Sequence, residues 1–395
     1  ELSWFRQKKK ERLSFFDGIP IVWKDLIDIV GYPAFAGSKL IKKIRKNQKV
    51  EDAQIVTLAR KSGLISLAKT RTVEFAFGGL GLNNSYKLPN NVMIKNNVVA
   101  PGGSSTGSAT SVFSGLAPLS VGTDTAGSVR IPAAWQSLIG FKPSANQIST
   151  KGILPLSASN DTVGTICKSV KDTQILFNIL SEKSYRFISE LNKNIKIGFV
   201  YNFNYEHLDD LSKNKIEDLI TKISQLGIVV KKDKIQAFDE INQFIKHNGS
   251  IVNFEAWKYW GNKIKGNLNK IDQNVVNRFL LGKSMSKEKV DFLKRKILLL
   301  KEKVYSKFDE YDFLLMPTLS IAPPSINILK NKEKYHLYNN FILDNTRVAN
   351  IFNLCCISLP LNSKNRRWLS VSLASKQYND EQLLVIAEKI ESILK

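Results

Sequence analysis

Short apolar stretches of strand character alternate with helical patterns along almost the whole chain, and this alternation limits the folds open to it. Near the centre, NIKIGFVYNF (194–203) predicts a strand, and the segment 208–232 predicts a helix, a turn at Gly227 and a further strand. Strands and helices that alternate in this way favour one α/β domain, in which helices cover both faces of a mixed, twisted sheet.

Other segments extend the same pattern towards both ends. EDAQIVTLARKSGLISLAKT (Glu51–Thr70) predicts a helix that breaks at Gly63, followed by a buried strand. Core strands and a closing amphipathic helix are also expected at 310–326, 348–361, 368–376 and 380–394. Between 241 and 303 the chain is rich in lysine and helical in pattern. We expect a single domain over 1–395 with a helical insert at 241–303, which either walls a substrate pocket or elaborates the surface.

The chain is strongly basic, with 58 Lys and Arg residues against 35 Asp and Glu residues and a formal net charge of +23. The lysines are scattered over the whole length, and the densest basic stretch, Lys39–Lys49, contains no aromatic residue. A solvated basic surface is therefore the preferred interpretation, and we expect no direct nucleic-acid partner. The charge still predicts a salt-dependent attraction to polyanions.

Cysteine and histidine usage bears on location and cofactors. Cys167, Cys355 and Cys356 form neither a CxxC motif nor a disulfide framework, which indicates reduced thiols and a cytoplasmic protein. With only three histidines, a metal site of His and Cys ligands is not expected. No apolar run of about 18 residues predicts a membrane span. Because the chain begins at Glu1 without a methionine, we expect a truncated N-terminus, which leaves a leader or an anchor upstream open.

The stretch PGGSSTGSATSVFSGLAPLSVGTDTAGSVRIPAAW (101–135) places two clusters of glycine and serine on either side of an apolar segment. Gly127 directly precedes Ser128, so successive backbone N–H groups there could converge on one point as an oxyanion hole. A phosphate-binding loop is the weaker alternative, because the chain has neither a GxxxxGK[ST] motif nor a GxGxxG motif after a strand.

A nucleophilic serine needs a base, and His207, His247 and His336 all lie far along the chain. Lysine or a carboxylate remains. Lys24 ends the apolar run Ile19–Trp23, and an apolar site would lower its pKa until the amine is neutral near pH 7. On this segment alone, however, a lysine at a strand end with its ammonium group in water is the preferred interpretation.

Taken together, these segments resemble the amidase signature family, the serine hydrolases with a Ser–cis-Ser–Lys triad. Within that family the chain resembles general amidases related to the A subunit of glutamyl-tRNA(Gln) amidotransferase. The resemblance implies a single domain of the amidase-signature type and covers nearly the whole chain, most weakly the insert. The matching stretches are 18–38, 101–134, 139–172, 314–326 and 345–361.

Each catalytic role is implied by the residue at the matching position. Ser128 corresponds to the nucleophile, Lys24 to the base, and Ser104 to the bridging serine that follows a cis peptide bond from Gly103. Ser104 is preferred to its neighbour Ser105 because it precedes Ser128 by 24 residues, as in the family. The implied chemistry is acyl transfer without a metal or an organic cofactor.

The resemblance also implies how the nucleophile is supported. Asp124 and Arg130 are expected to hold the loop that carries Ser128, although an ordinary buried ion pair explains them equally well. Ser105 is expected to shape the loop around Ser104. Ala126 departs from the family's usual glycine, which is tolerable if its φ stays negative. The backbone N–H groups expected to form the oxyanion hole are those of Thr125, Ala126, Gly127 and Ser128.

The preferred function is hydrolysis of the C–N bond of a linear carboxamide, with release of ammonia or an amine from a small-molecule substrate. The alternative is the glutaminase (A) subunit of a tRNA-dependent amidotransferase, which supplies ammonia to a partner subunit. A non-catalytic relative is disfavoured because the triad is complete. The segment 70–86 resembles general amidases, and 277–296 lacks the RRIMLGT-like stretch of the glutaminase type, so we favour a stand-alone enzyme. A homodimer, or partner subunits in the alternative, is left open as its assembly. Arg347 could meet a substrate carboxylate, but a helix-surface arginine is preferred.

Overall fold

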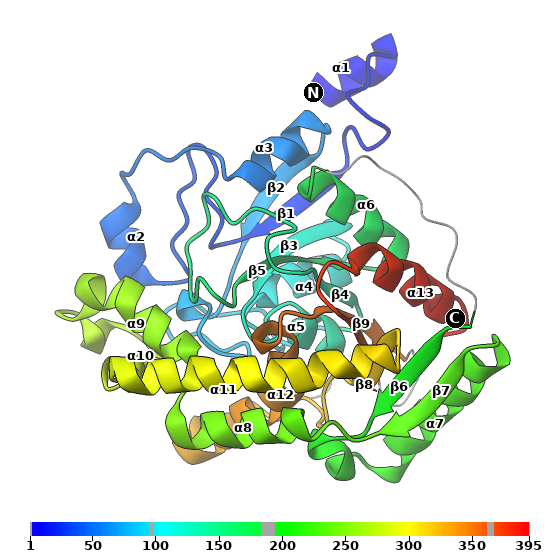
Figure 1. Ribbon diagram of the computed structural model, residues 1–395. Helices are drawn as coiled ribbons and strands as arrows, with labels where there is room; N and C mark the ends of the chain where they lie inside the picture. Colours follow the sequence, from blue (N-terminus) through cyan, green and yellow to red (C-terminus); the bar gives the residue numbers. More distant parts are fainter. Residues whose placement is uncertain (1, 95–97, 183–193, 362–366, 395) are drawn as a thin grey trace.

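The computed structural model describes residues 2–94, 98–182, 194–361 and 367–394. These residues form a ten-stranded sheet with helices packed around it (Figure 1). The strand order is β2-β1-β3-β5-β4-β9-β10-β8-β6-β7. The strands are β1 (Pro20–Lys24), β2 (Ile65–Thr70), β3 (Leu119–Asp124), β4 (Ile139–Lys142), β5 (Thr162–Cys167), β6 (Lys196–Val200), β7 (Val229–Asp233), β8 (Phe313–Pro317), β9 (Cys355–Pro360) and β10 (Ser370–Ser375).

The sheet is mixed, with parallel strands at both ends and antiparallel strands between them. β1 pairs in parallel with β2 and β3, and β6 pairs in parallel with β7 and β8. The pairs β3–β5, β5–β4, β4–β9, β9–β10 and β10–β8 are antiparallel. This arrangement confirms the predicted α/β class with a mixed sheet.

Alternating side chains along the strands supply a separate core to each face of the sheet. On β8, Phe313 and Leu315 pack in the same cluster as residues of the helices at 170–180, 210–225 and 380–392. Leu314 and Met316 pack instead with residues of the helices at 236–248, 287–305 and 332–351. Helices therefore cover both faces, as predicted. The helices are α1 (Leu2–Lys9), α2 (Lys39–Arg45), α3 (Gln54–Lys61), α4 (Thr106–Phe113), α5 (Arg130–Trp135), α6 (Val170–Leu180), α7 (Asp210–Gln225), α8 (Gln236–Asn248), α9 (Ile251–Ile264), α10 (Gln273–Lys283), α11 (Lys287–Tyr305), α12 (Lys332–Ile351) and α13 (Asp380–Ser392).

The strand predicted within Glu51–Thr70 exists as β2, but the prediction that it is buried is wrong. β2 is the terminal strand of the sheet, and Thr70 is its one fully buried residue. An edge strand has a neighbour on one side only, and here Ile65 and Leu67 remain exposed. Residues 241–303, where the sequence predicts a helical insert, run from within α8 to within α11.

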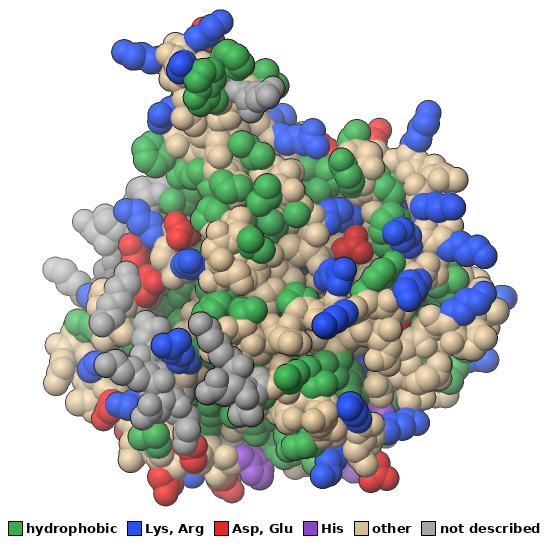
Figure 2. Space-filling view, turned by 180° about the vertical axis from the view of Figure 1, so that it is seen from behind, with side chains coloured by type: hydrophobic (Ala, Val, Ile, Leu, Met, Phe, Trp, Pro, Cys, Tyr) green, Lys and Arg blue, Asp and Glu red, His purple; other side chains and the backbone are tan. Residues whose placement is uncertain are grey.

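Charged and sulfur-containing side chains are distributed as follows. Lys and Arg side chains are scattered over the face shown in Figure 2, with Asp and Glu between them. Cys167, Cys355 and Cys356 are free and buried in the core. No helix within the described ranges combines the length and the apolar character needed to cross a membrane.

Candidate active site

Two parallel strands bring Lys24 and the serine-rich segments to one edge of the sheet. β1 and β3 are adjacent and in register, with Trp23 opposite Val121, so their carboxyl ends lie together. Lys24 is the last residue of β1, and the segment 125–129 connects β3 to α5. Residues that follow neighbouring parallel strands meet at this edge, which is why positions about 100 apart in sequence share one site.

The Lys24 side chain is completely buried and points at hydroxyl groups. Its Nζ lies 2.7 Å from Oγ of Ser104, 2.8 Å from Oγ1 of Thr123 and 3.2 Å from the Thr123 carbonyl oxygen. Burial lowers the pKa of Lys24 to about 7, while the negative charges of Asp124 and Asp161 act in the opposite direction. A large fraction of this amine is therefore neutral near pH 7. The strand-end interpretation, with the ammonium group in water, is wrong.

Ser104 lies in the turn before α4 and is fully buried. The peptide bond between Gly103 and Ser104 is cis. The turn is held from both sides, because the Gly103 N–H donates to the Gly79 carbonyl at 2.7 Å and the Thr72 hydroxyl donates to the Ser104 carbonyl at 2.8 Å. These contacts fix the backbone while the Ser104 hydroxyl faces Lys24.

Ser128 is almost completely buried. Together with Thr125 and Ala126 it lines a pocket next to Lys24 and Ser104. Its backbone is tied to the Ser104 turn, since the Ser105 N–H donates to the Ser128 carbonyl at 3.1 Å. Among the described residues no hydrogen bond joins the side chains of Ser104 and Ser128. The structure thus joins Lys24 to Ser104 directly and Ser128 to their turn through Ser105.

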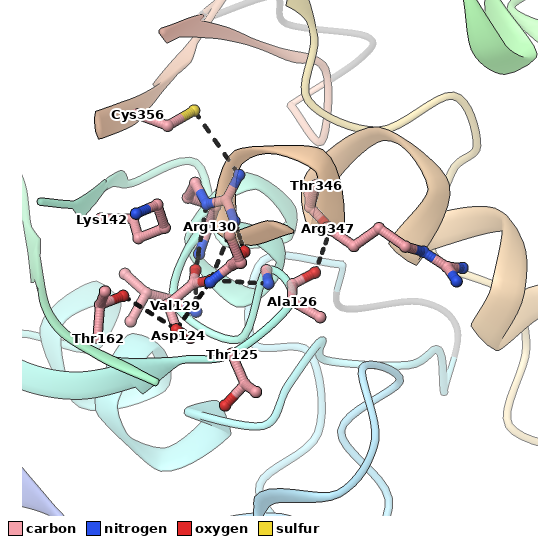
Figure 3. A network of polar contacts seen from close by, with 12 residues as sticks. Asp124, Thr125, Ala126, Val129, Arg130, Lys142, Thr162, Thr346, Arg347 and Cys356 are labelled. Atoms are coloured by element: carbon pink, nitrogen blue, oxygen red, sulfur yellow. Dashed lines mark hydrogen bonds and ion pairs between the residues drawn. The ribbon is translucent and has the colours of Figure 1, made fainter. Parts of the chain in front are cut away.

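Asp124 organises the segment that follows β3. Its carboxylate accepts hydrogen bonds from the backbone N–H groups of Gly127 at 2.8 Å and Val129 at 3.1 Å, and it pairs with both Nε and Nη2 of Arg130 at 3.1 and 3.0 Å (Figure 3). Burial raises the pKa of Asp124, but the charge and hydrogen bonds of Arg130 outweigh burial and hold it below its usual range. An ionised carboxylate thus fixes the backbone on both sides of Ser128.

The amides around Ser128 differ from the sequence prediction in one respect. The Gly127 N–H donates to Asp124, and Gly127 does not line the pocket, so this amide is already committed. The amides of Thr125, Ala126 and Ser128 have no acceptor in the part of the chain that the structure describes, and all three residues line the pocket. Ala126 keeps a φ that is not positive, so its methyl group causes no backbone strain.

Gly127 itself is required by the backbone and by its surroundings. It has a φ of +125°, and a Cβ at this position would collide with the Thr346 side chain. We expect Gly127→Ala to lower the free energy of unfolding by about 3 kcal/mol or more, from a strained φ and an overpacked contact. The measurement is urea unfolding. Gly115→Ala is the matched control, because its φ is +75° with nothing within 4 Å of the added Cβ, and it should cost only about 1–2 kcal/mol. Equal losses in the two variants would contradict the collision with Thr346.

Several residues that hold the site were not identified from the sequence. From α12, the Thr346 hydroxyl donates to the Ala126 carbonyl at 2.6 Å, and Asn350 Nδ2 donates to Asp124 Oδ1 at 2.9 Å. Thr123 contacts Lys24, and the Thr125 hydroxyl donates to Asp161 at 2.5 Å. The four residues missed are Thr123, Asp161, Thr346 and Asn350. All of them lie within stretches that resemble the family, but their spacing gave no sign of these partners.

A cavity of about 430 Å³ opens beside Ser128. Its walls include residues 76–79, the end of α8 and the start of α9, and parts of α10, α11 and α12. Residues of the 241–303 region thus form one wall of it. Arg347 also lines the cavity and is buried, with its Nη2 2.9 Å from Asp344, so the preferred interpretation of Arg347 as a helix-surface residue is wrong.

The chain belongs to the Amidase family, whose sequence pattern it matches over residues 3–384. This membership confirms the resemblance drawn from the sequence. It identifies the protein as an amide-cleaving hydrolase, a class that acts on small-molecule amides.

Individual relatives cover almost the whole chain. A 2-amino-5-chloromuconic acid deaminase from Comamonas testosteroni is 29% identical over 383 residues, which are 95% of this chain and 82% of the relative. The A subunit of glutamyl-tRNA(Gln) amidotransferase from Alkaliphilus metalliredigens is 27% identical over 426 residues, covering 97% and 84% of the two chains. A crystal structure of an amidase, 24% identical, shares the fold with a TM-score of 0.87 over 100% of this chain and 88% of that one.

Proposed function

We propose that the protein hydrolyses a small carboxamide through an acyl-enzyme on Ser128, with Ser104 as the bridging serine and Lys24 as the base. The observation that carries the proposal is the buried Lys24 amine, 2.7 Å from the Ser104 hydroxyl and with a pKa lowered to about 7. A neutral amine in that position accepts a proton that an ammonium group could not. No metal or organic cofactor enters the reaction.

The reaction follows from these positions. Lys24 takes a proton from Ser104, which takes one from Ser128 as its Oγ bonds to the amide carbon. The amides of Thr125, Ala126 and Ser128 stabilise the negative oxygen of the tetrahedral intermediate. The relay returns the proton to the nitrogen as the C–N bond breaks, so ammonia or an amine leaves. Water then cleaves the ester by the same relay and releases the carboxylic acid. In this proposal Asp124, Arg130 and Ser105 hold the loops and do not react.

The same proposal extends to assembly and location. We infer an amidase domain over 1–395 that carries a helical insert at 241–303, acting alone or as a homodimer. The free, buried cysteines support a cytoplasmic protein.

A second candidate function is that of a glutaminase that supplies ammonia to a partner subunit. The observation in its support is the similarity to an amidotransferase A subunit.

Ammonia release from a panel of primary amides that includes glutamine, measured with the purified chain alone, separates the two candidates. Hydrolysis of simple amides without a partner supports the stand-alone enzyme. Ammonia release restricted to glutamine and dependent on a co-purified subunit would establish the glutaminase instead. If no amide is hydrolysed under either condition, the proposed function is wrong.

The activity should depend on pH through Lys24. Because only the neutral amine accepts a proton and its pKa is about 7, kcat/KM should fall about tenfold per pH unit below pH 7 and level off above it. Burial raises the pKa of Asp161 to about 6, and its negative charge raises the pKa of Lys24. Asp161→Asn should therefore move the acid limb to lower pH. A flat profile between pH 5 and 8, or a shift to higher pH in Asp161→Asn, would contradict the role of Lys24.

A further inference from the structure

The cavity beside Ser128 is lined by positive charge. Among the described residues its walls contain no Asp or Glu, while they contain the basic side chains of Lys246, Arg278, Lys289 and Arg347. A cavity of about 430 Å³ has the size for a small molecule, and walls of one sign favour a ligand of the opposite sign.

Only part of this positive charge is neutralised by carboxylates of the protein. Asp344, just behind the wall, pairs with Arg347 at 2.9 Å and with Lys246 at 3.0 Å, so one carboxylate serves two cations. Burial lowers the pKa of Arg347 below its usual value, and Asp344 counteracts this only in part. This cluster keeps one net positive charge next to the cavity.

Arg278, on α10, has no carboxylate partner among the described residues. Its Nη1 donates to the Phe77 carbonyl at 2.5 Å, whereas its Nη2 is buried without a hydrogen-bond partner in the described part of the chain. The guanidinium group is fixed beside Tyr335, 5.4 Å from the ring centroid, and a Cβ added to Gly78 would lie 3.3 Å from Nη1. A partly buried cation that is held in place and has an unused donor is suited to bind an oxyanion of a ligand.

We propose that the substrate is an anionic amide, whose acyl portion carries a carboxylate that Arg278 binds while the amide carbon lies at Ser128. The positive cluster of Arg347, Lys246 and Asp344 reinforces the preference for a negative ligand. This inference rests on the proposed function for the position of the scissile amide, but the selectivity of the cavity for charge is independent of turnover.

The test uses isosteric pairs in which a carboxylate replaces one carboxamide. Malonamate, succinamate and glutaramate are each compared with the corresponding diamide for binding to the Ser128→Ala variant, by calorimetry at fixed ionic strength. We expect at least one acid to bind about 30-fold or more tightly than its diamide, as for a charge-assisted pair inside a cavity. Equal binding of every pair, or preference for the diamides, would overturn the proposal.

Variants assign the preference to Arg278. In the Ser128→Ala background, Arg278→Gln should remove most of the preference for the acid, and Arg278→Lys should keep part of it, because the charge remains without the planar fork. Lys222→Gln on exposed α7 makes the same change in net charge away from the cavity and should leave the preference intact. A preference that survives in folded Arg278→Gln, checked by thermal unfolding, would contradict the assignment. Charge-selective binding without ammonia release from any amide by the unmutated chain would leave this site standing and remove the proposed hydrolysis.

Discussion

Replacing Ser128 by alanine is expected to reduce ammonia release by a factor on the order of 10⁴ to 10⁶, because the attacking oxygen is lost. The fold should be unaffected, since no hydrogen bond of the Ser128 hydroxyl to another described residue is broken. Steady-state ammonia release from the best amide of the panel gives the rate, and intact-protein mass spectrometry after rapid quenching detects the acyl-enzyme. The acyl adduct should be present in the unmutated chain and absent from Ser128→Ala.

Ser120→Ala is the matched control for this experiment. Ser120 lies on β3, the strand that leads to Ser128, and its buried hydroxyl has no hydrogen-bond partner within the described ranges. Removing such a hydroxyl should be neutral for stability and should leave the rate within a few-fold. An acyl adduct that persists in Ser128→Ala would show that another residue is the nucleophile.

Replacing Lys24 by methionine is expected to lower kcat on the order of 10⁴-fold, because the proton of Ser104 then has no acceptor. Methionine fills a similar volume and removes a buried amine, which offsets the loss of the hydrogen bonds to Ser104 and Thr123, so the protein should remain folded. Lys24→Ala should be equally inactive but less stable, since it leaves a cavity. The measurements are kcat and urea unfolding of each variant.

Lys142 provides the matched control for Lys24. It is also fully buried, and burial together with Arg130 lowers its pKa to about 8, yet its Nζ donates to the Pro143 carbonyl at 2.8 Å and it does not line the cavity. Lys142→Met should therefore retain kcat within about tenfold, because this substitution affects the Asp124 network only indirectly. Near-normal turnover in folded Lys24→Met would mean that the base is another residue.

The arrangement of elements was predictable because each element buries its own pattern. Short apolar runs on strands such as β6 and β8 show in the sequence, and so does the amphipathic closing helix. The exposure of β2 was not predictable, because position at the edge depends on the order of strands, and this order is set by contacts between segments distant in sequence. The burial of Arg347 was missed for a related reason. Arg347 lies on α12 and lines the cavity, and the sequence of α12 alone does not show which other helices pack against it.

The candidate site was predictable only to the extent that it is local or resembles a family. Asp124, Gly127, Ser128 and Arg130 lie within one short stretch, so their connection could be expected. The lowered pKa of Lys24 follows from its complete burial. The apolar run before Lys24 suggested this burial but did not distinguish it from an ammonium group in water. The partners from α12 and the basic residues that line the cavity could be identified only in the folded structure. Hydrogen bonds such as that from Thr346 to Ala126 join residues about 220 positions apart in sequence.

The dependence of the Ser128 loop on α12 has a consequence for biosynthesis. Thr346 and Asn350 hold Ala126 and Asp124 in place, and they are translated some 220 residues after the loop they support. A nascent chain that has left the ribosome only as far as α11 already contains Lys24, Ser104 and Ser128 but lacks these supports. We therefore expect the proposed hydrolysis to arise late in synthesis, so that incomplete polypeptides carry the three side chains proposed to react without cleaving amides.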